Sequence, residues 1–306
     1  MELIQQTINA LLLGCNYTLI AIGFSLFFGA LNIVHFSHGD VCILGSFVVL
    51  ILYKLGSSLG LFAAWPAWIV APGVILTAAA VTGLMGALFE KLAIKPFRHA
   101  PELMVLVATV ALGLIIREAL RIFYPQGANP QIFPTLLPDG GFERGALFLR
   151  YDSLIILVAT VVLIILVFLF VERTRVGSAI RAVSQDTEAA MMMGISVNGT
   201  IAVTFLLGSA LGAVAGILNG AYISIIRYDM GLMGGIKGFS AAVVGGLGNI
   251  YGAILGGLML GFVETFASAL IPGGTAYKDV FSFLVVIFFL VFKPSGIVGE
   301  KVFEKV

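Results

Sequence analysis

The chain has few charged residues for its length. Charged residues make up 11% and hydrophobic residues 60% of its 306 residues, and the mean hydropathy is +1.10. Soluble domains contain about 25% charged residues, and part of any soluble fold must face water. We therefore expect lipid to surround the chain. The apolar runs are long enough for membrane-crossing helices, which need about 20 residues, whereas a membrane β-barrel would show alternating segments of about 10.

Cysteine, net charge and chemical motifs are scarce as well. Cys15 and Cys42 lie inside apolar segments, which favours small buried hydrophobes over a disulfide or a metal pair. A net charge of +1 leaves no basic surface for nucleic acid. The sequence contains no phosphate loop, nucleophile elbow or His–Glu zinc helix. It thus predicts no enzyme, cofactor or metal site, and an ATP-driven role would need a separate subunit. Met1–Gln6 lacks the positive charge of a cleavable signal, so we expect the first span to be retained.

Apolar segments predict an all-α, polytopic membrane protein with one transmembrane domain over residues 1–306. The sequence contains about eight apolar segments, and several of them are long enough to cross a membrane. The seventh is too long and too rich in glycine for one plain helix, so we expect a broken or re-entrant segment around 229–257. The segments are 7–30, 38–53, 64–89, 102–123, 152–171, 200–226, 238–271 and 276–292.

Basic residues predict which connections face the cytoplasm, because short cytoplasmic loops are enriched in Lys and Arg. The connections 90–101 and 172–188 both carry three such residues and are separated by two spans. The loop 124–151 then lies on the periplasmic side. The basic C-terminal tail also indicates the cytoplasm, which conflicts with three plain crossings after 172–188 and is a second reason to expect a break. The sides of the two termini stay open.

Two polar interruptions of the apolar pattern are candidates for a translocation path. One comprises Asn32, His35, Ser37, His38 and Gly39; the other comprises Gly245, Gly246 and Asn249. Ionisable groups at membrane depth are costly and usually functional, and broken helices line water-filled paths. The alternatives are an interfacial loop for the first and close helix packing, including packing on a partner, for the second.

A charged island, Thr174 to Ile195, lies between two uncharged runs. We expect a short helix over 177–194, on which Ala182, Asp186, Ala190 and Gly194 share one face at i+4 spacing. Small residues on that face would permit close docking of a soluble partner. The alternative is a solvated helix without a partner.

The island also resembles a known signature. Glu188-Ala189-Ala190, three residues and Gly194 are similar to the EAA–xxx–G motif of ABC importer permeases, although Thr204-Phe205-Leu206-Leu207 stands where that motif has Ile-x-Leu-Pro. A closer resemblance is to LivH-type permeases of branched-chain amino acid (HAAT family) importers. Four blocks carry it: Gly14–Phe47, Thr174–Ile195, Gly238–Glu264 and Phe292–Gly299, with Ser37-His38-Gly39 where the family typically has Ala-His-Gly.

This resemblance implies a permease subunit in a bacterial inner membrane that forms half of the path for branched-chain or other amino acids. It implies a LivM-type second permease, two ATP-binding subunits and a periplasmic solute-binding protein as partners. Within a cytoplasmic coupling loop, 172–198, the residues expected to contact the ATPase are Gly177, Arg181, Ala182, Asp186, Glu188, Ala189, Ala190 and Gly194. Urea, short amides and aromatic acids are alternative cargoes of such importers. A stand-alone secondary carrier is the competing class, and it would need ionisable groups at mid-membrane.

Overall fold

The computed structural model describes residues 2–62, 65–98, 100–138, 140–144 and 147–299. Within these ranges the chain is almost entirely helical, and eight helices are long and apolar enough to cross a membrane. The all-α, polytopic prediction is therefore confirmed. The helices are α1 (Glu2–Leu31), α2 (His38–Ser58), α3 (Ala67–Phe89), α4 (Glu102–Phe123), α5 (Tyr151–Arg173), α6 (Arg175–Gln185), α7 (Thr187–Met192), α8 (Val197–Ile223), α9 (Met230–Gly245), α10 (Ile250–Leu270) and α11 (Lys278–Phe292).

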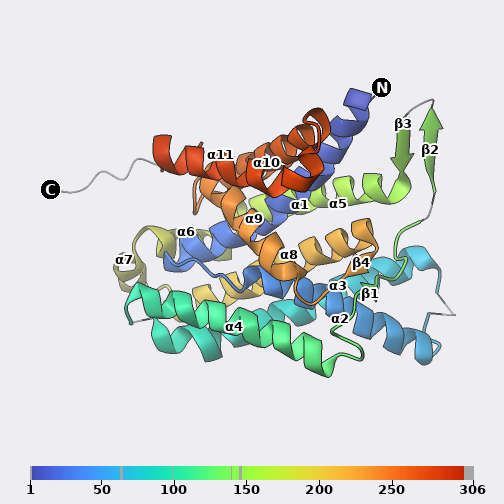
Figure 1. The fold of residues 1–306 in the computed structure, drawn as a ribbon. Helices are drawn as coiled ribbons and strands as arrows, with labels where there is room; N and C mark the ends of the chain where they lie inside the picture. The colour runs from blue at the N-terminus through green and yellow to red at the C-terminus, as the bar shows by residue number, and fades with distance from the viewer. Residues whose placement is uncertain (1, 63–64, 99, 139, 145–146, 300–306) are drawn as a thin grey trace.

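Short irregular elements mark the two ends of the bundle. A π-helical turn (Glu90–Ile94) and a 3-10 turn (Lys95–Phe97) extend α3. At the other end, β1 (Gln131–Ile132) pairs antiparallel with β4 (Ile225–Ile226), with Gln131 opposite Ile226. The strands β2 (Gly141–Arg144) and β3 (Leu147–Arg150) form a hairpin with Gly141 opposite Arg150. Figure 1 shows this hairpin at the same end as the N-terminus, opposite α6 and α7.

The core forms around α1, which packs on α8, α9 and α10. Small residues allow this close approach, because helices in lipid associate by backbone-level packing. A side chain at Gly257 would collide with the backbone of Thr18, and one at Gly261 would collide with the backbone of Gly14. The small-xxx-small spacing of α10 is thus used inside the chain, against α1.

The expected break lies at residues 246–249, where α9 ends and α10 begins. Gly246 and Gly248 have φ of +115° and +84°, a region that favours glycine. The Asn249 side chain then caps α10, its Oδ1 accepting a hydrogen bond from the Gly252 N–H at 3.1 Å. With 16 residues, α9 is about 24 Å long, which is shorter than α1, α2 and α10, on which it packs.

This break resolves the conflict over the C-terminal tail. Four helices, α8 to α11, follow the α6–α7 region instead of three spans. The tail therefore returns to the end of the bundle that holds α6, α7 and the connection between α3 and α4 (Figure 1). Residues 300–306 lie outside the described part, so the lysines at 301 and 305 are not placed.

Candidate functional site: a docking segment and a polar cavity

Three polar side chains build the segment between α5 and α8, which we call the docking segment (174–196). Each accepts a hydrogen bond from a backbone N–H at the start of a helix. Thr174 caps α6 through the Gly177 N–H at 3.0 Å, and Ser196 caps α8 through the Gly199 N–H at 3.3 Å. Asp186 caps α7 through the N–H groups of Glu188 and Ala189, both at 2.9 Å. Such caps each stabilise a helix start by about 1 kcal/mol, so the sequence itself divides this segment.

The prediction of one helix over 177–194 is wrong, because Asp186 separates two helices. Its backbone is extended, with φ −156° and ψ 108°. The i+4 face through Ala182, Asp186, Ala190 and Gly194 is therefore not continuous. Gly194, with φ +81°, ends α7 in the left-handed conformation, while the Ile195 N–H donates to the Ala190 carbonyl at 3.0 Å.

Burial also changes which residues a partner can touch. Gly177 and Ala190 are buried within the chain, whereas Asp186, Glu188, Ala189 and Gly194 are exposed. The most exposed apolar side chains here are Met192 and Met193, at 88% and 82%. Sequence reasoning missed them, although three consecutive methionines in a charged island were a visible signal. Flexible methionine side chains suit protein-binding surfaces.

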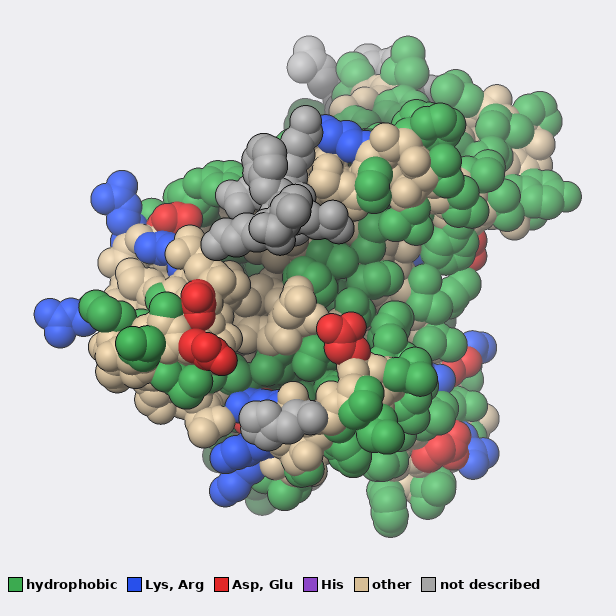
Figure 2. Space-filling view, turned by 90° about the vertical axis from the view of Figure 1, so that its left-hand side faces the viewer, with side chains coloured by type: hydrophobic (Ala, Val, Ile, Leu, Met, Phe, Trp, Pro, Cys, Tyr) green, Lys and Arg blue, Asp and Glu red, His purple; other side chains and the backbone are tan. Residues whose placement is uncertain are grey.

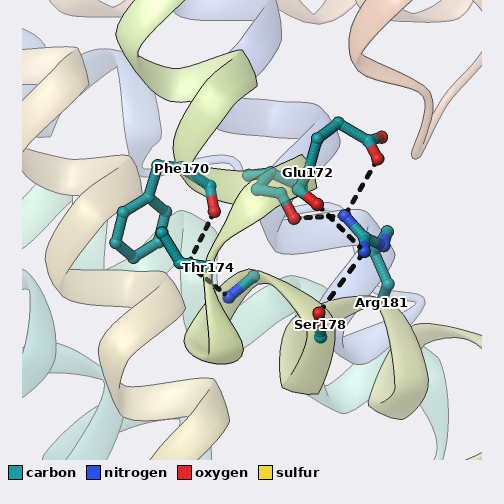
Figure 3. Close-up of polar contacts among 7 residues, drawn as sticks. Phe170, Glu172, Thr174, Ser178 and Arg181 are labelled. Carbon is teal, nitrogen blue, oxygen red and sulfur yellow. Dashed lines mark hydrogen bonds and ion pairs between the residues drawn. The ribbon is translucent and has the colours of Figure 1, made fainter.

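Arg181 joins the docking segment to α5 (Figure 3). Its guanidinium donates to the carbonyl oxygen of Val171 and forms an ion pair with Glu172 at 3.1 Å. A longer hydrogen bond, 3.4 Å, reaches the Ser178 hydroxyl. Basic groups at a helix C-terminus satisfy its free carbonyls. Arg181 therefore fixes the angle between α5 and α6, and its guanidinium is engaged within its own chain.

Figure 2 looks onto the end of the bundle that carries α6 and α7, where Lys, Arg, Asp and Glu side chains gather among tan backbone and polar groups. The basic residues of the α3–α4 connection belong to this end, and Arg98 there donates to the Asn198 side chain at the start of α8 at 2.8 Å. This end is therefore charged, as expected of a surface that meets water rather than lipid.

A polar cavity of about 530 Å³ lies toward the opposite end of the bundle, where α8 ends and α11 begins. It is lined by parts of α1, α2, α4 and α8 to α11. Its polar lining includes Asn16, Arg117, Asn219, Lys237, Glu264 and Asp279. A second hollow of about 560 Å³, against α2, α3 and α4, has a mostly aliphatic and aromatic lining. The first offers many more groups that can replace the water around a polar solute.

Ion pairs tie the helices around the polar cavity together. Lys237 of α9 lies 2.7 Å from Glu264 Oε1 of α10 and 2.6 Å from Asp279 Oδ1 of α11. Arg117 of α4 donates to both carboxylate oxygens of Asp40 in α2, at 3.1 and 2.9 Å. Charges at membrane depth are costly unless they are paired. Their pairing here therefore fixes the positions of five helices around one space.

A third pair stands on the connection between α8 and α9. Arg227 donates to both oxygens of Asp229, at 2.7 and 2.5 Å. These hydrogen bonds lower the pKa of the Asp229 carboxyl. Both residues line the cavity, so this pair keeps a charged carboxylate at its edge.

The sequence is similar to a family of known proteins. The family model for the permease component of the branched-chain amino acid transport system matches residues 6–290. The chain belongs to this permease family.

The relatives match over most or nearly all of their length. The high-affinity branched-chain amino acid transport system permease protein BraD of Pseudomonas aeruginosa is 36% identical, over 99% of this chain and 98% of its own length. The corresponding LivH protein of Escherichia coli K12 is 33% identical, over 99% and 97%. A probable LivH of Methanocaldococcus jannaschii is 31% identical, over 92% and 88%. The chain is therefore a multi-pass transport permease of the inner membrane.

The permease buries most of the predicted path residues of its first polar island. Ser37 and His38 are fully buried, and His35 is 3% exposed. The His38 ring packs edge-on against Phe24 and Phe27, with ring centroids 5.0 Å apart in each pair. In this conformation these three side chains do not line the polar cavity and are not exposed to solvent.

Asn32 and Gly39 stand at opposite ends of this connection. Asn32 is exposed and adopts the left-handed conformation, with φ +53°. Its N–H donates a hydrogen bond to the Phe28 carbonyl at 2.7 Å, at the end of α1. Gly39, in the first turn of α2, is the predicted path residue that lines the polar cavity.

The second predicted stretch is covered by the permease's own tail. The N–H groups of Ile297 and Val298 donate to the carbonyls of Val244 and Gly245, both at 2.9 Å. Gly245 and Gly246 are buried, and Asn249 serves as the cap of α10. Their role in a path stays a prediction for another conformation.

Sequence reasoning missed the charged lining of the cavity. Neither Glu264 nor Lys237, a lysine within the glycine-rich segment, was among the predicted path residues. The available signal was the presence of both charges in otherwise apolar runs.

Proposed function

We propose that this permease is one membrane subunit of an ATP-driven ABC importer and forms half of the path for branched-chain amino acids. The names of its full-length relatives support this cargo. A LivM-type second permease, two ATP-binding subunits and a periplasmic solute-binding protein would complete the assembly. The partners would hydrolyse ATP. Urea, short amides and aromatic acids remain alternative cargoes for an importer of this type.

The observation that carries the proposal is the docking segment. It presents exposed methionines on a charged end of the bundle, which suits a soluble partner and not lipid. We place residues 172–198 on the cytoplasmic side, where an ATP-binding subunit would bind, and the loop 124–151 on the periplasmic side, where the solute-binding protein would bind.

Rigid connections would transmit movement of the partner to the path. Arg181 attaches α6 to the end of α5, and Ser196 starts α8 three residues after the turn at Met193. The far end of α8 lines the polar cavity through Ala215, Gly216 and Asn219. A displacement of the docking segment would therefore move α5 and α8 as rigid bodies and change access to the cavity.

The competing hypothesis is a stand-alone carrier driven by an ion gradient. The buried ion pair between Lys237 and Glu264 favours it, because such carriers need ionisable groups at membrane depth. The two hypotheses differ in one measurement. Uptake into liposomes that contain this chain alone, with a proton or sodium gradient and no ATP, supports the carrier and contradicts the importer.

Replacing Met192 and Met193 with glutamate is expected to uncouple the importer. Two carboxylates in an apolar contact would have to lose water without a partner, and central contacts of an interface are commonly worth 2 kcal/mol or more. We expect substrate-stimulated ATP hydrolysis in proteoliposomes that contain the assembled importer to fall about tenfold or more, since about 1.4 kcal/mol corresponds to tenfold.

The matched control replaces both methionines with leucine, which keeps the apolar surface and should keep hydrolysis near its normal rate. Glu188→Gln should also have little effect, because exposed ion pairs contribute about 0–1 kcal/mol. Substitutions at Ala190 or Gly194 are poorer tests, since Ala190 is buried and Gly194 has a positive φ. Normal stimulated hydrolysis in the double glutamate variant would refute docking through these methionines.

A further inference from the structure

Lys237 has two acidic neighbours, and a second lysine, Lys278, lines the same cavity. One ammonium group lies between two carboxylates, those of Glu264 and Asp279. Glu264 is fully engaged: Lys237 contacts both its oxygens, and the hydroxyls of Tyr17 and Ser282 each donate to Oε2 at 2.9 Å. Glu264 therefore has little remaining capacity to bind another cation.

Of the two carboxylates, that of Asp279 has capacity left to accept hydrogen bonds. Its side chain is 38% exposed, whereas that of Glu264 is 4% exposed, and both line the polar cavity. Asp279 stands in the first turn of α11, where the helix dipole stabilises an anion. A charged carboxylate thus faces the cavity with Lys237 as its one ion-pair partner among the described residues.

We propose that Asp279 binds the α-ammonium group of the cargo in the polar cavity. This inference rests on the proposed function and deepens it, because it assigns one pole of an amino acid to one residue of this chain. A charge-assisted hydrogen bond from an ammonium group is short and strong. It would also neutralise the carboxylate when the cavity closes and water leaves.

The rest of the cavity fits a small amino acid with a branched aliphatic side chain. Its volume, about 530 Å³, lies within the range of ligand pockets, about 300–1,000 Å³. Ile20, Ile43 and Leu232 supply aliphatic lining, and Asn16 and Asn219 supply amide groups. A divalent cation fits less well, since Lys237 already occupies the space between the two carboxylates.

Thiol protection tests this site without any partner subunit. Gly234 lines the cavity, and a Cβ added there meets no atom within 4 Å, so Gly234→Cys should fold normally. The native Cys15 and Cys42 are buried, and the chain without the new cysteine gives the background. The full chain in lipid nanodiscs is treated with an uncharged methanethiosulfonate reagent, which forms a mixed disulfide with the thiol and releases methanesulfinate. The rate of this modification is followed against ligand concentration.

Three ligands of similar shape distinguish the ammonium group of the cargo from its carboxylate. They are leucine, which has both groups, 3-methylbutylamine, which has the ammonium group, and 4-methylpentanoate, which has the carboxylate. Leucine and the amine should protect the cysteine, and 4-methylpentanoate, which lacks the ammonium group, should not. Asp279→Asn should raise the leucine concentration for half-protection about tenfold or more, as expected for loss of a charged hydrogen bond. Glu118→Gln, which removes a carboxylate paired with Arg121 outside the cavity, is the matched control and should leave protection unchanged.

The outcomes distinguish this site from the proposed function. An unchanged modification rate of the Asp279→Asn variant without ligand shows that the cavity is intact. Equal protection by leucine in parent and Asp279→Asn, or protection by 4-methylpentanoate as good as that by leucine, overturns the role of Asp279. No protection by leucine also overturns it, and ATP-dependent leucine uptake by the assembled importer then shows whether the proposed function still stands.

Discussion

Replacing Lys237 with methionine should lower the free energy of unfolding of the permease by about 3–5 kcal/mol, because removal of one partner leaves a buried charge uncompensated. Glu264 is 3% exposed and lies among helices α1, α9, α10 and α11. Methionine retains the length and apolar stem of lysine but provides no counter-charge. The hydroxyls of Tyr17 and Ser282 would then be the remaining donors to this carboxylate.

The double variant Lys237→Met with Glu264→Gln is the matched control. A neutral glutamine still accepts hydrogen bonds from Tyr17 and Ser282, so most of the lost stability should return, and the cycle of single and double variants measures the coupling. Unfolding of the purified chain in detergent, followed by intrinsic fluorescence, provides the measurement. If Lys237→Met is as stable as the parent, the pair does not hold these helices together.

The sequence was sufficient to predict the local features of this fold. Long uncharged runs predicted the spans, since length and hydropathy are properties of single segments. Consecutive glycines followed by Asn249 predicted the end of one helix, and the structure places the break between Gly245 and Ile250. The conflict over the basic tail was informative as well, because it required an extra helix, which is α9.

Contacts between distant segments could not be predicted in this way. Lys237 and Glu264 are 27 residues apart, and Asp40 and Arg117 are 77 apart. No periodicity links such pairs, so the charged lining of the cavity was not foreseen. The burial of His38 could not be predicted for the same reason. Its neighbours Phe24 and Phe27 come from α1, across the connection at 32–37.

The docking segment shows how one residue can overturn a pattern. The i+4 spacing from Ala182 to Gly194 suits a helix, but Asp186 adopts an extended conformation and caps the next helix with its side chain. Aspartate favours this role because its carboxylate accepts hydrogen bonds from free N–H groups. The signature glycine, Gly194, ends α7 in the left-handed conformation and is exposed.

A valine at Gly39 should disrupt the contact between α2 and α9, with a cost of about 3 kcal/mol, at the upper end for overpacking. A Cβ at this position would lie 2.6 Å from the Gly235 Cα, 2.7 Å from the Gly235 nitrogen and against the Gly231 carbonyl oxygen. All three atoms belong to the α9 backbone, which cannot rotate away as a side chain can. The two helices would have to separate.

That separation would also disturb the polar cavity, since the residue after Gly39 is Asp40, the partner of Arg117, and α9 carries Lys237. We therefore expect Gly39→Val to lower the thermal unfolding midpoint by several degrees, because about 1 kcal/mol shifts the midpoint by roughly 2–4 °C in larger domains. In the Gly234→Cys chain it should also weaken the protection of the new cysteine by leucine. Gly73→Val is the control, because a Cβ there meets nothing within 4 Å and valine is a better helix former than glycine. Equal midpoints for the two variants would mean that α2 and α9 can move apart without loss, and the close glycine contact would then not position the cavity.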